Sequence, residues 1–150
     1  MFDNVYMREA LNQARIAYKN SEIPVGAIIV NSAGEIISTG SNMVEKCKNP
    51  MMHAENIAIF RALRKLKQKS LTGCSLYVTL EPCYMCAGAI ANSKISRVYI
   101  GAEDRRFGAI LNGARIYQNK LVNFTPEVYG DIMELECQEL LDSFFQKLRC

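Results

Sequence analysis

The sequence predicts an α/β fold, a three-layer α/β/α sandwich around a mixed five-stranded sheet. Short β-branched runs alternate with segments of helical periodicity, which is typical of helices packed on the faces of one sheet. The length of 150 residues fits one domain, so we expect a single domain over residues 1–150. A composition with 49% apolar and 22% charged residues suits a folded core and excludes a disordered chain.

The first predicted elements are a helix and a hairpin. Apolar side chains recur at helical spacing along residues 3–20. Two apolar, β-branched runs at 25–30 and 35–40 flank the turn-forming residues Asn31-Ser32-Ala33-Gly34, which predicts an antiparallel hairpin with a four-residue loop.

Helices and strands alternate in the rest of the chain. We expect strand–helix–strand units here to be parallel, with right-handed crossovers. After an irregular stretch that ends at Pro50, the predicted elements are a helix at 53–69, a strand at Ser75–Leu80, a small-residue helix at 83–93, a strand at 97–101, an irregular segment at 102–120, a short strand at Glu127–Tyr129 and an amphipathic helix at 131–149.

Charge is unevenly distributed along the chain. Residues 46–120 carry thirteen basic and four acidic side chains, a net charge of +9, whereas residues 1–45 and 121–150 have net charges of −2 and −4. A basic middle segment can steer an anionic partner such as nucleic acid, but scattered surface lysines would give the same pattern. The longest apolar run, 85–91, is too short to span a bilayer.

The cysteines favour a reducing compartment. Of the six, only Cys83 and Cys86 form a close pair, whereas Cys47, Cys74, Cys137 and Cys150 are scattered. The N-terminus lacks the pattern of an export signal, and a core of this size needs no disulfides. We therefore expect free cysteines and a cytoplasmic location.

One histidine and one cysteine pair carry the chemistry that the sequence predicts. His53, the only histidine, begins one predicted helix, and Cys83 and Cys86 begin another directly after a strand. Three protein ligands of these types leave the fourth position of a tetrahedral Zn²⁺ open, as in catalytic zinc sites. Helix N-termini favour anionic thiolates there.

Glu55 separates the competing interpretations of these residues. A Cys-x-x-Cys pair after a strand is also typical of redox dithiols, and a structural zinc would need Cys47 or Cys74 as a fourth ligand. Both alternatives leave Glu55, two residues after His53, without a role. A carboxylate at that position can accept the proton of a zinc-bound water without ligating the metal. His-x-Glu followed by Pro-Cys-x-x-Cys is the pattern of zinc-dependent nucleobase deaminases.

Over nearly its whole length the chain resembles the bacterial tRNA-specific adenosine deaminases, of the cytidine deaminase-like superfamily. The likeness rests on Ile23-Pro24-Val25-Gly26-Ala27, His53-Ala54-Glu55, the run at 76–89, Ser93-Lys94-Ile95, Gly101-Ala102 and Phe144-Phe145. The zinc motif alone marks the wider superfamily. The run at 76–89 narrows the assignment within this superfamily to the tRNA branch and its near relatives, the guanine and cytosine deaminases.

This resemblance implies a function and several roles. It implies hydrolytic deamination of the wobble adenosine to inosine in an anticodon loop, of an arginine-type tRNA, by a homodimer with one Zn²⁺ per chain. Deamination of a free base or nucleoside is the alternative. The resemblance assigns the metal ligands to His53, Cys83 and Cys86, acid/base catalysis to Glu55, and substrate binding to Asn42, the backbone N–H of Ala54, Val25, Leu80, Asp104 and Phe145.

The departures from the family pattern concentrate on the expected RNA side. Arg106 replaces a usual lysine, Ile110-Leu111-Asn112-Gly113 replaces a typical Gly-Ser-Leu, and Asn123-Phe124 replaces a common Asn-His pair. Met51-Met52 replaces smaller residues, and the basic tail of the family is absent after Cys150. The candidate phosphate contacts are Arg105 and Arg106, with Lys65, Lys67 and Lys69.

Overall fold

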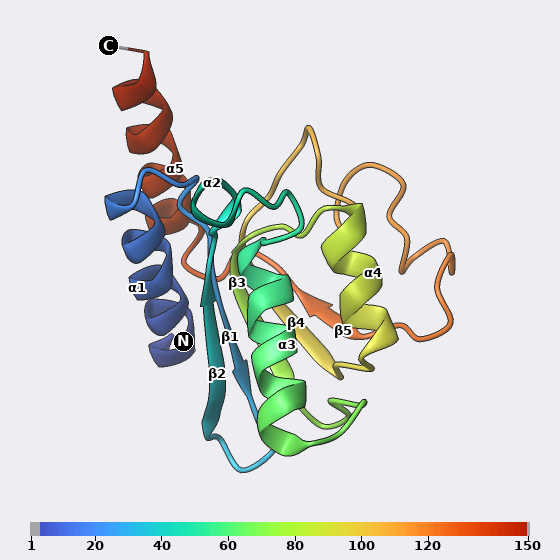
Figure 1. Ribbon diagram of the computed structural model, residues 1–150. Coiled ribbons are helices and arrows are strands. Elements are labelled where there is room, and N and C mark those ends of the chain that lie inside the picture. Colours follow the sequence, from blue (N-terminus) through green and yellow to red (C-terminus); the bar gives the residue numbers. More distant parts are fainter. Residues whose placement is uncertain (1–3, 150) are drawn as a thin grey trace.

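The computed structural model describes residues 4–149 and contains a mixed five-stranded sheet (Figure 1). The strand order is β2-β1-β3-β4-β5, with β1 antiparallel to both of its neighbours and with the β3–β4 and β4–β5 pairs parallel. The strands are β1 (Gly26–Val30), β2 (Ile36–Ser41), β3 (Ser75–Leu80), β4 (Arg97–Ala102) and β5 (Glu127–Tyr129). The predicted hairpin and the parallel strand–helix–strand unit around 83–93 are confirmed.

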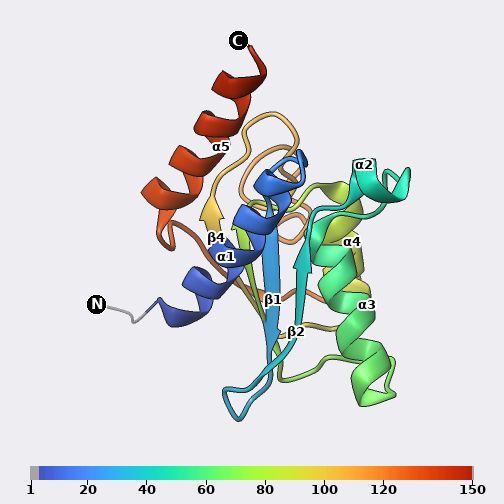
Figure 2. The same ribbon diagram turned by 60° about the vertical axis from the view of Figure 1, so that its left-hand side comes forward.

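Helices cover both faces of this sheet, which confirms the three-layer sandwich. The helices are α1 (Val5–Lys19), α2 (Val44–Cys47), α3 (Ala54–Leu66), α4 (Tyr84–Asn92) and α5 (Glu134–Leu148). Figure 2 shows α1 and α5 on one face and α3 and α4 on the other. Within residues 4–149, no helix is long and apolar enough to cross a membrane.

Several predicted boundaries were wrong for conformational reasons. α3 ends at Leu66 rather than residue 69, because Lys67 adopts a left-handed conformation with φ of 52°. α5 begins at Glu134 rather than 131, since Asp131 and Met133 also have positive φ angles and cannot continue a helix. Leu148, near the end of the predicted amphipathic helix, is exposed. Residue 3 of the first predicted helix and Cys150 lie outside the described residues.

The sheet places the chemistry-bearing segments at one edge. β2, β3 and β4 run in the same direction and end on that side. Asn42 follows β2, Leu80 is the last residue of β3, and Val25 precedes β1 there. Ligands in open α/β sheets bind outside the carboxyl ends of strands. Gly40 allows the first turn of α3 to approach β2, since a Cβ at this position would collide with the Ala54 carbonyl. This close approach fixes the start of α3 at the same edge.

Candidate active site

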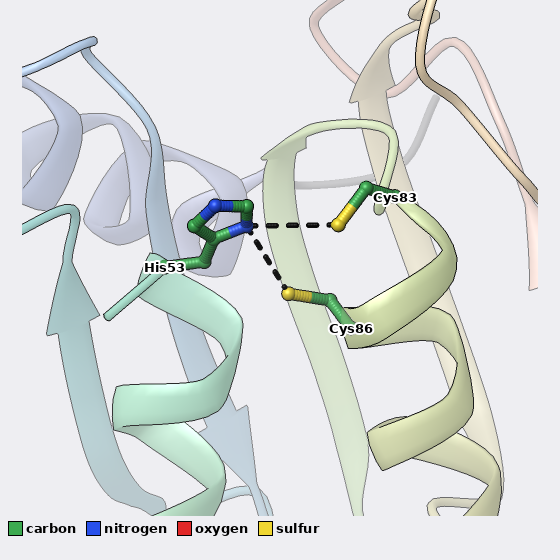
Figure 3. Close-up of side chains that lie close together, drawn as sticks. All are labelled: His53, Cys83 and Cys86. Carbon is green, nitrogen blue, oxygen red and sulfur yellow. Dashed lines mark hydrogen bonds between the residues drawn. The ribbon is translucent and has the colours of Figure 1, made fainter. Parts of the chain in front are cut away.

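Two helix starts bring His53, Cys83 and Cys86 together (Figure 3). His53 is the N-cap residue of α3 and Cys83 that of α4, each with an extended backbone and no side-chain capping hydrogen bond. Cys86 lies in the first turn of α4. The His53 Nδ1 is 3.6 Å from the Cys83 Sγ and 3.5 Å from the Cys86 Sγ. The imidazole thus faces both sulfurs.

The geometry of these three side chains fits a tetrahedral zinc. Zinc about 2.0–2.1 Å from a nitrogen and about 2.3 Å from a sulfur holds those atoms roughly 3.5–3.6 Å apart at a tetrahedral angle. The two Nδ1–Sγ distances match that separation. In the described part of the chain no further histidine, cysteine or acid joins the group. Cys47 is exposed and Cys74 lies in the hydrophobic core, so neither supplies the fourth ligand of a structural zinc.

The local interactions favour an anionic sulfur at Cys83, whereas the hydrogen bond to Cys83 and burial raise the pKa of Cys86. Hydrogen bonds from the Cys86 thiol and from His53 lower the pKa of Cys83 to about 4, although partial burial opposes the shift. The hydrogen bond to Cys83 in turn raises the pKa of His53. The Cys83 thiolate can therefore bind a metal cation directly, whereas the His53 imidazolium and the Cys86 thiol would release their protons to it, because zinc ligands are deprotonated.

Glu55 lies beside the cluster without belonging to it. The side chain sits in the first turn of α3, is only 3% exposed, and lines the same pocket as His53 and Cys83. Burial raises the pKa of Glu55 to about 7. A carboxyl group poised near neutrality suits proton transfer in both directions. The observed position of Glu55 is therefore compatible with the general acid/base role that the His-x-Glu spacing predicts.

The pocket above these residues has a volume of about 300 Å³. That is at the lower end of the range for small-molecule sites. It brings together all but one of the substrate-binding residues predicted from the sequence, the exception being Phe145. The lining residues are Ile23, Val25, Asn42, His53, Ala54, Glu55, Leu80, Glu81, Cys83, Asp104 and Phe107.

A second pocket of about 280 Å³ adjoins the first and shares Ile23, Leu80, Asp104 and Phe107 with it. It holds the predicted residues that the first pocket lacks, Phe145, Arg105 and Arg106. By contrast, the lysines at 65, 67 and 69 lie at or beyond the far end of α3, about 18 Å along its axis from the metal cluster. The structure does not bring these lysines to the site.

Asn42 is held in place by a buried anchor that the sequence did not reveal. Its Nδ2 donates to the Ile23 carbonyl, and its Oδ1 accepts weakly from the Val44 N–H at 3.4 Å. The following residues form α2, a short helix that was missed in the predicted irregular stretch. The buried Glu22 carboxylate accepts hydrogen bonds from two backbone N–H groups of that helix, at 2.8 and 2.9 Å. This anchoring fixes the chain on the Asn42 side of the pocket.

Glu81 anchors the opposite wall and was also missed. Its buried carboxylate accepts backbone N–H groups from Asp104 and from residues 110, 111 and 112, at 2.9–3.2 Å. It also accepts the Asn112 side-chain amide at 2.7 Å. The divergent segment after Gly108 is therefore tied to the residue just before Pro82-Cys83. In the sequence, the only sign of a role for Glu81 is its position directly before the Pro-Cys-x-x-Cys motif.

Comparisons with known proteins agree with this geometry. The family described as "Cytidine and deoxycytidylate deaminase zinc-binding region" matches residues 1–102. The tRNA-specific adenosine deaminase of Rickettsia bellii is 44% identical over 144 residues, which cover 95% of this chain and 99% of the relative.

Two solved structures show the same fold. One, from a study of A-to-I editing by tRNA:A34 deaminases at the wobble position of transfer RNA, is 38% identical, with a TM-score of 0.89 over 92% of this chain and 99% of that one. The guanine deaminase of Bacillus subtilis is 36% identical, with a TM-score of 0.64 over 69% of this chain and 66% of that one. With its His-Cys-Cys cluster and buried first-turn glutamate, the chain belongs to the zinc-dependent cytidine and deoxycytidylate deaminase family, in the branch of the tRNA-specific adenosine deaminases.

Proposed function

We propose that the protein hydrolyses adenosine to inosine, with release of ammonia, at the wobble position of a tRNA anticodon loop. The observation that carries this proposal is the His53-Cys83-Cys86 cluster with Glu55 beside it at the base of a small pocket. The near full-length likeness to tRNA-specific adenosine deaminases supports the substrate. An arginine-type tRNA is the first candidate, and the cytoplasm, where free cysteines persist, is the proposed location. We take residues 1–150 to act as one domain.

In this proposal His53, Cys83 and Cys86 hold the metal and Glu55 moves the protons. Zinc, when bound, supplies a water whose pKa is lowered to about 7 and which can attack C6 of adenine. The Glu55 carboxylate accepts the proton of that water and donates it to the ring nitrogen N1. The same carboxylate then takes the proton of the hydroxyl group now on C6 and delivers it to the amino group, so that the C6–N bond breaks, the C6 carbonyl forms and ammonia leaves.

The pocket walls orient the base in this scheme. Val25 and Leu80 offer apolar surfaces to a planar ring, while Asn42 and the backbone N–H of Ala54 offer polar contacts in the same pocket. Asp104 lies at the boundary with the second pocket, next to the expected flanking nucleotide. A base must leave its stack to enter, and a single-stranded anticodon loop makes this step inexpensive.

A free-base deaminase is the second candidate, and the likeness to the Bacillus subtilis guanine deaminase favours it. Purified protein should therefore be assayed in parallel with arginine tRNA carrying the wobble adenosine, free adenosine, guanine and cytosine. We expect inosine in the tRNA and at least a 100-fold lower kcat/KM for each small substrate. Efficient release of ammonia from guanine or cytosine, with no inosine in the tRNA, would transfer the assignment to the second candidate.

The exposed Arg105 and Arg106 supply the expected phosphate contacts. Each contact to single-stranded RNA contributes about 0.7 to the slope of log K against log salt concentration. Replacing both arginines with glutamine should weaken RNA binding and flatten this slope by about 1.5, as measured by filter binding. The matched control removes the same charge from Lys65 and Lys67, at the far end of α3. An equal change in both variants would indicate general electrostatics rather than a local contact.

We also propose a homodimer that forms across the α3–α4 face. This face carries the exposed apolar side chains Met51, Phe60 and Tyr84, with exposed fractions of 56%, 63% and 56%, and no further layer of residues 4–149 covers it (Figure 1). A Cβ at Gly88 of α4 would meet nothing within 4 Å, so this part of the helix is open to close packing. Exposed apolar surface of this kind is typical of protein interfaces.

Sedimentation tests the dimer. The wild-type protein should sediment at about twice the chain mass of 16.9 kDa at micromolar concentration. Replacing Phe60 with glutamate should raise the dissociation constant about tenfold or more, the size of effect seen when a central aromatic is lost from an interface. Leu135→Glu is the matched control, because Leu135 is equally exposed but lies on α5, across the sheet. A wild-type monomer would contradict the proposal.

A further inference from the structure

Phe107 stands exposed at the junction of the two pockets. Its side chain is 62% exposed and lines both the pocket at the metal cluster and the second pocket beside it. The second pocket also contains Arg105, Arg106 and Phe145. A group that occupies both pockets at once therefore lies within reach of this ring.

The turn that carries Phe107 is firmly held. The Asp104 carboxylate accepts the backbone N–H groups of Arg106 and Phe107, both at 3.0 Å, and the Asp104 carbonyl accepts the Gly108 N–H at 2.9 Å. Glu81 accepts the N–H of Asp104 itself. The ring thus projects from a turn that is fixed at its base, which limits the conformational freedom that a ligand would have to remove.

The surroundings of the ring suit a nucleic acid. The guanidinium carbon of Arg106 lies 5.0 Å from the ring centroid, in cation–π geometry, so a positive charge stands directly beside an apolar surface. Arg105 is exposed next to it. Aromatic rings that alternate with cations are the arrangement by which proteins hold unpaired bases, the ring stacking on the base and the cation contacting the phosphate. The core does not use this ring, so packing alone does not account for it.

We propose that Phe107 is a stacking platform for the unpaired nucleobase next to the one that is deaminated. The inference rests on the proposed RNA substrate. With the target base in the pocket at the metal cluster, the neighbouring base lies toward the second pocket, and the ring between them offers a flat face. Such stacking tolerates any base, because every base has a π-face. Phe107 would therefore favour a substrate that carries a flanking nucleotide, of any base, over a free nucleoside.

The test uses the holoenzyme and an anticodon stem-loop RNA with 2-aminopurine beside the target adenosine. Phe107→Ala and Phe107→Leu should each raise KM about tenfold, within the range measured for loss of one base–aromatic stack, and leave kcat within about threefold. Phe107→Trp should keep a wild-type KM. The fluorescence quenching of 2-aminopurine on binding should be lost in the alanine and leucine variants. Zinc content and melting temperature serve as controls for the fold.

Salt dependence separates this role from that of the arginines. Phe107→Ala should weaken binding without changing the salt slope, whereas the Arg105/Arg106 variant flattens it. A wild-type KM and wild-type quenching in Phe107→Leu would show that the side chain makes only a nonspecific apolar contact, and would contradict the proposed stacking. An unchanged KM in Phe107→Ala would overturn it as well, with the deaminase function intact. If the wild-type protein forms no inosine in RNA but deaminates a free base, the proposed function fails, and the platform fails with it.

Discussion

Replacing Glu55 with alanine should lower kcat at least 100-fold while the protein keeps its zinc. Proton transfer by a positioned side chain contributes about 10²–10⁴ to rate, and no other carboxylate among the pocket residues is free to take over. Glu81 is occupied by five hydrogen bonds, and Asp104 caps the turn after it. Inosine formation in single-turnover experiments, with metal analysis of the same sample, measures both effects.

Glu55→Gln is the matched control for volume. Glutamine fills the same buried space but cannot accept and return a proton, so it should be as inactive as alanine and retain zinc equally well. Substrate binding should change little in either variant, because Glu55 acts on protons rather than on the ring as a whole. Loss of zinc from either variant, or turnover near the wild-type rate, would disprove the acid/base role.

The sequence was sufficient for the parts of the site that local spacing determines. A ligand pair three residues apart at a helix start lies on one side of the turn whatever the rest of the fold does. His53 and Glu55, two residues apart, line one pocket because His53 is the N-cap residue of α3 and has an extended backbone. The alternation of β-branched runs and helical periods likewise predicted the layers correctly, since each element must bury its apolar face. Even β5, only three residues long, was confirmed at Glu127–Tyr129.

The parts that escaped prediction depend on partners distant in sequence. Glu81 and the backbone of residues 110–112 are about thirty positions apart, and no sequence pattern in either segment predicts their hydrogen bonds. Glu22 anchors α2 across a similar gap. The left-handed residues that end α3 and delay α5 are a lysine, an aspartate and a methionine, Lys67, Asp131 and Met133. Tertiary contacts determine such conformations, and no local propensity encodes them.

These long-range anchors also bear on the departures from the family pattern. The segment 110–113 differs from the usual sequence, yet its backbone N–H groups and the Asn112 side-chain amide donate hydrogen bonds to the Glu81 carboxylate. The anchor uses mainly N–H groups, which any residue except proline supplies. The side chains of this segment can therefore diverge without displacing Asp104 from the pocket wall, which is how the chain combines an altered loop with an intact catalytic centre.

Cys86→Ser should remove the metal and with it all measurable activity. Cys86 is completely buried, and its Sγ lies 3.5 Å from the His53 Nδ1, so it is one of the three side chains that can hold the metal. A serine hydroxyl is a poor zinc ligand at neutral pH, which leaves only two protein donors. Metal analysis should fall from about one zinc per chain to near zero.

The matched control is Cys47→Ser, which changes an exposed cysteine on α2 and should leave both zinc content and turnover unchanged.

Because a metal that binds only the folded state stabilises it by mass action, chelation of the wild-type protein should also lower its melting temperature. The same treatment should have no effect on Cys86→Ser, which has no zinc to lose. A metal-free wild-type protein in which Cys83 and Cys86 form a reversible disulfide would instead support the redox dithiol. Since His53 faces both sulfurs at distances that match a tetrahedral zinc, we expect the metal.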